Sequence, residues 1–464
     1  MGNVIGSIFF VIYLRPNINA QDRQFTPCPG IVCSYLENFQ RERRKVPATW
    51  NFFCLTILAL NPSFVIWSVS GLENSLYVFL VIMVLWKTLE YGKNKNNTSK
   101  LIITIAILSA FCALTRPDGI LYVAIFPLVI FIESLLTKNN IKDTLKPIFM
   151  HLGVFILIFG SYIVFRYFYF GDFFPNTYYA KGGGITLAPD EWFEKTGNLL
   201  NSAGLLKYIF ISISSMFIYL GFTKNITRPL IILAVAIAIS LIIFILLPAD
   251  WMPEFRFATP FFPMFYLLMY ITAELFYEKT DLNRSISSIL LIVLFMLFLT
   301  DSSSSFLSRS INFAKSPTVP FTLVAELYGH RFNEYAVSLG IEDGSILLPD
   351  VGGTLYYSHL KVYDLAGLTD KVIAQSLGNN QVFYDYVFDT LKPVFIHTHG
   401  TWAYASNFDA DPRFRQDYIA INEAIDKSIF AHTGESLYSG DYVRKDSVSD
   451  YDALLKIQAS FNDQ

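Results

Sequence analysis

The sequence predicts a polytopic α-helical membrane protein with an α/β domain at its C-terminal end, outside the membrane. Hydrophobic residues make up 53% of the 464-residue chain and charged residues only 16%, whereas a soluble protein carries about 25% charged residues. Apolar runs long enough to cross a bilayer follow one another as far as residue 300. After residue 300, short apolar strands alternate with helical stretches, which is typical of an α/β layer.

The first domain, residues 1–300, contains about nine apolar runs that we expect to be full membrane spans. They are 48–69, 74–90, 101–116, 119–136, 147–170, 203–222, 228–248, 257–277 and 285–300. The apolar stretch Met1–Leu14 precedes them, but it is shorter than the ~20 residues that a span needs. It has no basic region before it and no small-residue cleavage site after it, so it is not a signal peptide. We expect it to be the end of a truncated first span.

The loop charges predict the orientation of the chain in its membrane. Seventeen lysines and arginines lie in one alternate set of loops and four in the other. Because cytoplasmic loops are enriched in Lys and Arg, we expect the first set to be cytoplasmic. The same alternation places the second domain, residues 301–464, on the outer side. A net charge of -3 excludes the basic surface that a nucleic-acid partner requires.

Four polar motifs fall in the loops that are poor in positive charge, and therefore on the outer side. They are Ser70–Glu73, Arg116–Gly119, Gly171–Lys181 and Asp250–Phe257. Ionisable groups in or near a bilayer are costly and tend to mark function. We therefore expect the four motifs to meet in one external site.

The first two motifs each have a structural and a functional interpretation. Arg116 and Asp118 flank a proline in a tight connection, where they can form a simple ion pair; alternatively, the fork of donors on Arg116 binds a phosphate and Asp118 a sugar. Glu73 stands at the start of a span, where a negative charge favours the helix. Its alternative role is to accept a proton or hydrogen bond from a substrate hydroxyl.

The other two motifs combine aromatic and charged residues. In Asp250–Phe257, Trp251 offers a stacking surface for a sugar, Arg256 a phosphate contact and Asp250 a carboxylate for hydroxyls, although an interfacial tryptophan is also ordinary. In Gly171–Lys181, the groups expected to face a ligand are Asn176, Tyr178 and Lys181. The alternative for this stretch is an interfacial amphipathic connector.

In the second domain we expect strands at Ser345–Pro349, Lys361–Leu365 and Pro393–His397, with helices near 321–339 and 382–391. Open α/β sheets bind ligands at the carboxyl ends of their strands. Four titratable residues fall at such ends, namely Asp350, Asp364, His397 and His399.

The composition of this domain indicates no cofactor. His397 and His399 alternate on a strand and so share a face, but two histidines without a third ligand do not make a zinc site. Gly352 and Gly353 do not form the glycine pattern of a dinucleotide site. We expect no cofactor; the sequence indicates no divalent metal but does not exclude one.

Taken in order, the motifs resemble those of the GT-C superfamily of membrane glycosyltransferases. The shared pattern runs SGLE, RPDG, GDFFPNTYYAK and DWMxxxRFxxP, followed by DVGGTLYYS and VYDLAGLTD. Within the superfamily, the chain is similar to the terminal β-(1→2) arabinofuranosyltransferase of mycobacterial cell walls and its uncharacterised bacterial relatives. The resemblance covers about residues 48–375.

The resemblance implies transfer of a sugar from a polyprenyl-phosphate donor to a glycan or glycolipid acceptor outside the cytoplasmic membrane. A carboxylate then deprotonates the acceptor hydroxyl while cations steady the departing phosphate. By position, Glu73, Arg116 and Asp118 match two external loops of the family, Asn176, Tyr179 and Lys181 match its PNT-x-YAK-type loop, and Asp250, Met252 and Arg256 match its external Asp-aromatic-Met segment. We expect Glu73 and Asp250 to act as the acids and Arg116, Arg256 and Lys181 to contact the phosphate. The residues expected to bind the sugar are Asp118, Asn176, Tyr178, Tyr179 and Trp251.

The chain departs from the family at its N-terminal end. The superfamily carries an acidic motif in the first external loop, whereas here the first acidic residue, Asp22, lies in a basic loop. A mis-called start, a decayed gene or a separate N-terminal polypeptide would each explain this, and the chain as written would then be inactive alone. The alternative functions are a transporter or flippase of lipid-linked sugars and a non-catalytic envelope assembly protein.

Overall fold

The computed structural model describes residues 48–93, 98–138, 140–180, 188–222, 227–248, 250, 252–279, 284–316, 321–376, 379–427 and 437–462. The chain divides into two compact units. The helical unit comprises Met1–Gly171 and Ile185–Lys315, and the sheet unit comprises Asp172–Gly184 and Ser316–Gln464. The expected truncated span at Met1–Leu14 lies outside the described residues.

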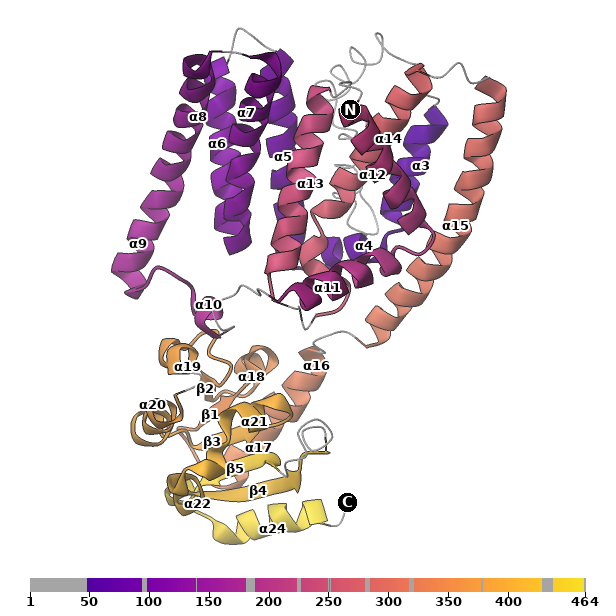
Figure 1. Ribbon diagram of the computed structural model, residues 1–464. Helices are drawn as coiled ribbons and strands as arrows, with labels where there is room; N and C mark the ends of the chain where they lie inside the picture. Colours follow the sequence, from indigo (N-terminus) through magenta and orange to yellow (C-terminus); the bar gives the residue numbers. More distant parts are fainter. Residues whose placement is uncertain are drawn as a thin grey trace, which may run out of the picture. The chain divides into compact units, whose positions relative to one another are not determined.

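The described part of the helical unit is built from helices (Figure 1). They are α3 (Ala48–Ala59), α4 (Pro62–Val69), α5 (Asn74–Lys93), α6 (Thr98–Thr115), the 3₁₀ helix η1 (Pro117–Ala124), α7 (Ile125–Thr137), α8 (Ile141–Phe155), the π-helical turn η2 (Ile156–Gly160), α9 (Ser161–Phe170), α11 (Pro189–Ser202), α12 (Leu206–Phe222), α13 (Arg228–Leu246), the 3₁₀ turn η3 (Arg256–Ala258), α14 (Phe261–Lys279) and α15 (Arg284–Lys315).

Five helical segments in the described residues are long and apolar enough to cross a membrane: Asn74–Lys93, Thr98–Thr115, Pro117–Thr137, Ile141–Phe170 and Arg228–Leu246. Each coincides with a span expected from the sequence. The chain is therefore mostly helical and has the features of a multi-pass membrane protein. The other expected spans also fall on helices, among them α12, α14 and α15.

The expected span at 48–69 is two helices, α3 and α4, bent by 64°. The break follows from Asn61 and Pro62. The Asn61 side chain accepts a hydrogen bond from the Phe64 amide at 2.8 Å and caps α4. Pro62 starts α4 and cannot donate to the preceding turn. The bend carries α4 toward the residues that follow α13, where Trp67 donates a hydrogen bond to the Glu254 carbonyl at 2.9 Å.

Helix α15 changes the boundary that we expected at residue 300. It continues through the serines 302–305 to Lys315, so the chain enters the sheet unit at Ser316. The added turns carry Asp301 and Arg309, which contact other parts of the helical unit.

The sheet unit contains a five-stranded sheet in the order β2-β1-β3-β5-β4 (Figure 1). The strands are β1 (Ser345–Leu348), β2 (Lys361–Asp364), β3 (Phe395–Thr398), β4 (Tyr418–Ile425) and β5 (Tyr438–Arg444). β1 pairs in parallel with β2 and β3, as expected, whereas β5 pairs antiparallel with both β3 and β4. The antiparallel pair was not predicted from the sequence.

Helices cover both faces of this sheet. They are α16 (Phe321–Val324), η4 (Ala325–His330), α17 (Arg331–Ser338), α18 (Val351–Tyr357), α19 (Lys371–Ser376), α20 (Asn380–Asp385), η5 (Tyr386–Leu391), α21 (Thr401–Ser406), η6 (Phe408–Ala410), α22 (Pro412–Asp417), η7 (Lys445–Ser447) and α24 (Tyr451–Asn462). One core joins Phe332 of α17 and Leu454 of α24 to β1, β3 and β5. A second core on the other face contains Phe383, Phe388 and aromatic residues of η6 and α22.

The polar stretch after α9 belongs to the sheet unit. Helix α9 ends at Gly171, which has a φ of 66°, and the chain continues into the short helix α10 (Asn176–Ala180). The Asp172 carboxylate accepts hydrogen bonds from Tyr179 at 2.5 Å and from Gln375 of α19 at 2.8 Å, and it lies 3.4 Å from Lys371. These bonds fix the stretch to α19.

Candidate functional site

Arg116 connects the first two polar motifs of the helical unit. It follows α6, and the turn into η1 brings its side chain back over the start of α5. Its Nη1 lies 2.6 Å from Glu73 Oε1, and its Nε donates to Asp118 Oδ1 at 3.0 Å. The Tyr77 hydroxyl donates to the other oxygen of Asp118 at 3.1 Å. Arg116 therefore stands between two carboxylates and is itself buried.

Gly119 makes this turn possible. A Cβ at this position would lie 2.1 Å from the carbonyl oxygen of Cys112 and 3.0 Å from the ring of Tyr77. Only glycine allows η1 to approach α6 so closely. The motif at 116–119 is thus both a tight turn and the holder of a buried ion pair.

The fourth motif folds around a second arginine. Arg256 donates through Nε and Nη2 to the two oxygens of Asp250, both at 2.9 Å. This two-pronged geometry is the strongest form of an arginine–carboxylate pair. Glu254 and Phe255 both have a positive φ, which turns the chain sharply enough to return Arg256 to Asp250.

The two arginines share one aromatic ring. The guanidinium carbons of Arg116 and Arg256 lie 5.1 and 4.9 Å from the centre of the Phe257 ring. Asn74, at the start of α5, donates a hydrogen bond to the Arg256 carbonyl at 3.1 Å. Three of the four polar motifs, far apart in the sequence, therefore contact one another at one end of the helical unit.

A third ion pair extends this cluster. Glu254 accepts hydrogen bonds from Arg309 of α15, one of them from Nε at 3.0 Å. It also accepts a hydrogen bond from the Ser63 hydroxyl of α4 at 3.1 Å. The Trp67 ring links the pairs, because the guanidinium of Arg256 lies 5.8 Å from its centre. The sequence analysis missed Glu254 as a site residue and also missed Arg309. Glu254 could have been recognised as an acidic residue inside the fourth motif. Its partner Arg309 could not, because it meets Glu254 only through the extension of α15.

A cavity opens beside this third pair. It is wide open to the surface, has a volume of about 470 Å³ and is lined by Asn201, Ser202, Gly204, Glu254, Phe255, Asp301, Ser305 and Arg309. Ligand pockets for small molecules span about 300–1,000 Å³. The lining carries two carboxylates and a guanidinium, so it suits a polar, hydroxyl-rich ligand with an anionic group. We refer to this cavity and the three ion pairs together as the polar cluster.

The carboxylates differ in how far a ligand can reach them. The side chain of Glu73 is 38% exposed, whereas those of Asp118 and Asp250 are 9% exposed. Glu73 is thus the carboxylate open to a substrate hydroxyl. Asp118 and Asp250 instead hold the two arginines in place.

The remaining predicted site residues do not belong to the described part of the helical unit. Asn176, Tyr178 and Tyr179 are on α10 in the sheet unit, where the Tyr178 ring stacks on Phe174 at 4.5 Å and Tyr179 binds Asp172. Lys181 and Trp251 lie outside the described residues. Whether all four motifs share one site stays a prediction.

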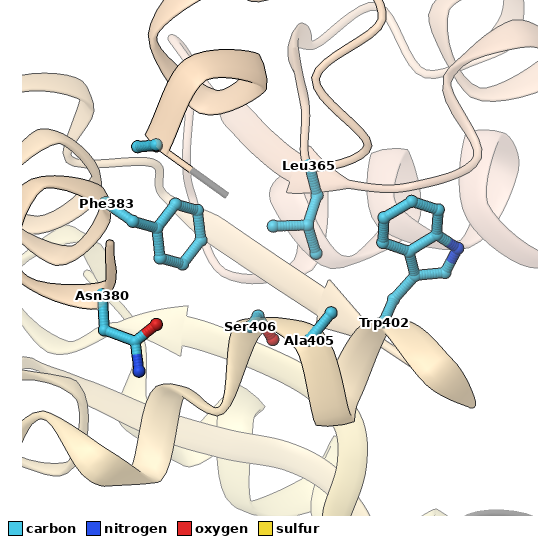
Figure 2. A pocket seen from close by; sticks show the side chains of 7 residues that line it. Leu365, Asn380, Phe383, Trp402, Ala405 and Ser406 are labelled. Carbon is cyan, nitrogen blue, oxygen red and sulfur yellow. The ribbon is translucent and has the colours of Figure 1, made fainter. Parts of the chain in front are cut away.

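The sheet unit has a small hollow of its own, shown in Figure 2. Leu365, Phe383 and Trp402 form most of its wall, and Asn380 and Ser406 lie at its edge. Its volume is about 20 Å³, little more than one water molecule needs. Its lining has no charged side chain, so it offers no counterpart to a phosphate.

Among the predicted residues of the sheet unit, Asp364 has a structural role. Its carboxylate accepts hydrogen bonds from the amides of Ala366 and Thr369 and from the Thr369 hydroxyl, which shapes the loop after β2. The histidines are arranged differently: His397 contacts His399, and His399 faces Asp350. The described residues hold no group of three His, Cys, Asp or Glu side chains that fits a metal ion.

Comparison with known protein families gives a match within the sheet unit. A family model described as a domain of unknown function (DUF8728) matches residues 328–445. This segment runs from η4 to the end of β5, so it contains all five strands of the sheet, together with His397 and His399. No curated protein matches the chain. The match covers the central part of the sheet unit and assigns no activity to it.

Proposed function

We propose that the chain is a GT-C-type glycosyltransferase of the bacterial cytoplasmic membrane. It takes a sugar from a polyprenyl-phosphate donor and transfers it to a cell-envelope glycan or glycolipid on the outer face. The observation that carries this proposal is the polar cluster. Arg116, Arg256 and Arg309 come from distant parts of the sequence and gather at one end of the spans, beside a cavity of suitable size.

The placement of these groups suits a lipid-borne donor. A polyprenyl chain lies among the spans and presents its phosphate at their ends, where the polar cluster is found. Ionisable groups at this depth are costly and are a functional hypothesis by default. Buried ion pairs also add little net stability to a fold, since apolar residues of similar volume often stabilise it as well or better.

The chemistry is a displacement at the anomeric carbon. The acceptor oxygen forms a bond to this carbon while the bond between the carbon and the phosphate oxygen breaks, and polyprenyl phosphate leaves. The hydroxyl proton passes to a carboxylate, for which we propose Glu73 because it is the accessible one. Arg309 lines the cavity and offers the cation for the leaving phosphate.

A second candidate is a non-catalytic envelope assembly protein that binds the same lipid. The pairing of both Arg116 and Arg256 with carboxylates favours it, since each guanidinium already has an internal counter-ion. In this case the donor would bind without being consumed. Binding and transfer must therefore be measured separately.

Donor binding is tested by photo-cross-linking in lipid nanodiscs. The probe is polyprenyl-phosphate arabinose with a diazirine in the lipid chain. We expect cross-linking that unlabelled donor competes away and that falls at least tenfold in Arg256→Gln. The matched control is Arg228→Gln, which breaks the Arg228–Glu133 pair (2.7 Å) at the other end of α13. Equal loss in both variants, or no specific cross-linking in the wild type, would refute the proposal.

A further inference from the structure

The carboxyl ends of β1 and β3 form a position where α/β sheets place ligands. β1 lies between β2 and β3, and the chain goes from β1 to β2 on one side and then crosses to β3 on the other. Such a reversal of strand order leaves a crevice outside the carboxyl ends of the two diverging strands. Asp350 follows β1, and His399 follows β3, so the two residues stand on either side of it.

A chain of hydrogen bonds leads from this position into the sheet. His397 Nδ1 lies 2.6 Å from Asp441 Oδ1, and His397 Nε2 lies 3.1 Å from His399 Nδ1. His399 Nε2 in turn lies 3.3 Å from Asp350 Oδ2. The inner members are buried, with side chains 7% exposed for His397 and 2% for Asp441. The outer members are accessible, with 41% for His399 and 33% for Asp350.

The inner end of the chain fixes which nitrogens carry protons. Asp441 also accepts hydrogen bonds from the Tyr335 hydroxyl and from Arg331, so it acts as an acceptor toward His397. The Nδ1 of His397 therefore carries the proton, and in the neutral ring Nε2 is an acceptor. His399 must then donate through its own Nδ1, which leaves its Nε2 as an acceptor too.

At the outer end of the hydrogen-bond chain, two acceptors consequently face each other. With both histidines neutral, His399 Nε2 and Asp350 Oδ2 face one another at 3.3 Å with no proton between them. Two donors from a ligand would satisfy this arrangement. Hydroxyls on adjacent carbons are within hydrogen-bonding distance of one another, so a vicinal diol offers two donors at a matching spacing.

We propose that Asp350 and His399 form a carbohydrate-binding site that holds two adjacent sugar hydroxyls, one on each acceptor. The buried His397–Asp441 pair is the positioning element, since it sets the tautomer of His399. The site is independent of the proposed transferase cluster in the helical unit. It lies within the segment that matches the domain of unknown function.

Acid should close this site, because a proton on His399 Nε2 turns that acceptor into a donor to Asp350. Burial, and then the neighbouring His397, lower the pKa of His399 below its ordinary value, while Asp350 and Asp426 oppose this. The other groups around the pair are Asp441 on β5, Arg331 on α17 and the Tyr328 ring on η4, which stacks on His399. The acceptor form is therefore the one present at neutral pH, and binding is lost only below the ordinary histidine pKa of about 6.5.

Saturation-transfer NMR on the full-length protein in detergent tests this site. The probes are methyl α-D-mannopyranoside, methyl α-D-galactopyranoside and methyl α-D-arabinofuranoside, with n-butylamine as a non-sugar donor. We expect saturation transfer from the protein to at least one glycoside at pH 7.5, and a saturation-transfer signal at least fivefold weaker at pH 5. The same reduction is expected in His399→Gln and in Asp350→Asn.

The control is His330→Gln, an exposed histidine of the same unit that contacts the Tyr357 ring. It should bind as the wild type does, and all variants should show the same thermal unfolding. No transfer to any glycoside, or equal transfer in His399→Gln, would overturn the proposal. Transfer that depends on His399 but goes to the amine alone would overturn the carbohydrate assignment. Because no donor lipid is used, none of these outcomes bears on the proposed transferase.

Discussion

Arg116 and Arg256 lie on the same aromatic ring, 5.1 and 4.9 Å from the centre of Phe257. Each of the two like charges has a carboxylate partner, Asp118 at 3.0 Å for Arg116 and Asp250 at 2.9 Å for Arg256. The negative face of an aromatic ring also attracts guanidinium groups. The two carboxylates and the ring therefore hold both cations at the end of the spans and reduce the repulsion between them.

Breaking the first of these pairs should be costly. Arg116→Ala leaves the buried carboxylate of Asp118 without its cation, and we expect the free energy of unfolding to fall by about 3–5 kcal/mol. The measurement is unfolding of the purified protein in mixed micelles with increasing SDS. The control Lys87→Ala removes an accessible pair with Glu90 on α5 and should cost about 0–1 kcal/mol. Similar losses in both variants would show that the Arg116 pair does not hold the turn.

The turn at Gly119 should tolerate no side chain. A Cβ there meets the Cys112 carbonyl at 2.1 Å, so Gly119→Ala should force η1 away from α6 and destabilise the protein by about 1–3 kcal/mol. Gly153→Ala is the matched control within α8, because nothing lies within 4 Å of its Cβ. There alanine should stabilise the helix by about 0.5–1 kcal/mol. The free energy of unfolding is measured in the same SDS assay. An unchanged free energy of unfolding in Gly119→Ala would contradict the close approach of η1 to α6.

The segment around α10 should loosen when Asp172 loses its charge. The hydrogen bond from Tyr179 lowers the pKa of Asp172 to about 2. Its stabilising effect is thus fully present above the unfolded-state pKa of about 3.9 and lost as the pH falls toward 2. At pH 7, Asp172→Asn should speed trypsin cleavage at Lys181 several-fold, as followed by gel electrophoresis. Asp343→Asn, an exposed acid before β1, should leave the rate unchanged; equal rates for Asp172→Asn and the wild type would mean that this carboxylate does not anchor the segment.

The two ends of the helical unit should face opposite sides of the membrane. In a cysteine-free background, Leu72→Cys stands beside the polar cluster, and Lys138→Cys stands between α7 and α8 at the other end of the spans. An impermeant maleimide added to intact cells should label position 72 and reach position 138 only after the cells are opened. Labelling of both positions in intact cells would contradict the orientation derived from the loop charges.

The apolar runs were sufficient to predict the helices, because long apolar segments have few alternatives in a bilayer. The sequence does not show where α15 ends, because serines 302–305 and the prolines after Lys315 both resemble a domain boundary. Strands β1, β2 and β3 were recognisable as short apolar runs. β5 was not, because its Asp441 and Arg444 break the apolar pattern and its partners are distant in sequence.

Residue types in the site were easier to predict than their partners. The Arg116–Asp118 ion pair can be predicted because the two residues are only two positions apart. Glu73, Asp250 and Arg256 can be recognised as ionisable residues between apolar runs. Contacts across the fold required the structure. Arg309 meets Glu254 only through the extended α15, and Asp441 meets His397 only through the antiparallel pairing of β3 and β5.

Transfer of labelled sugar tests the central claim most directly. Membranes from cells producing the chain are incubated with polyprenyl-phosphate [¹⁴C]arabinose and envelope glycan, and label in the glycan is counted against membranes that lack the chain. The account predicts chain-dependent transfer that Glu73→Gln abolishes while donor cross-linking persists and that Arg228→Gln leaves intact. Donor cross-linking without any chain-dependent transfer, or undiminished transfer by Glu73→Gln, would contradict it.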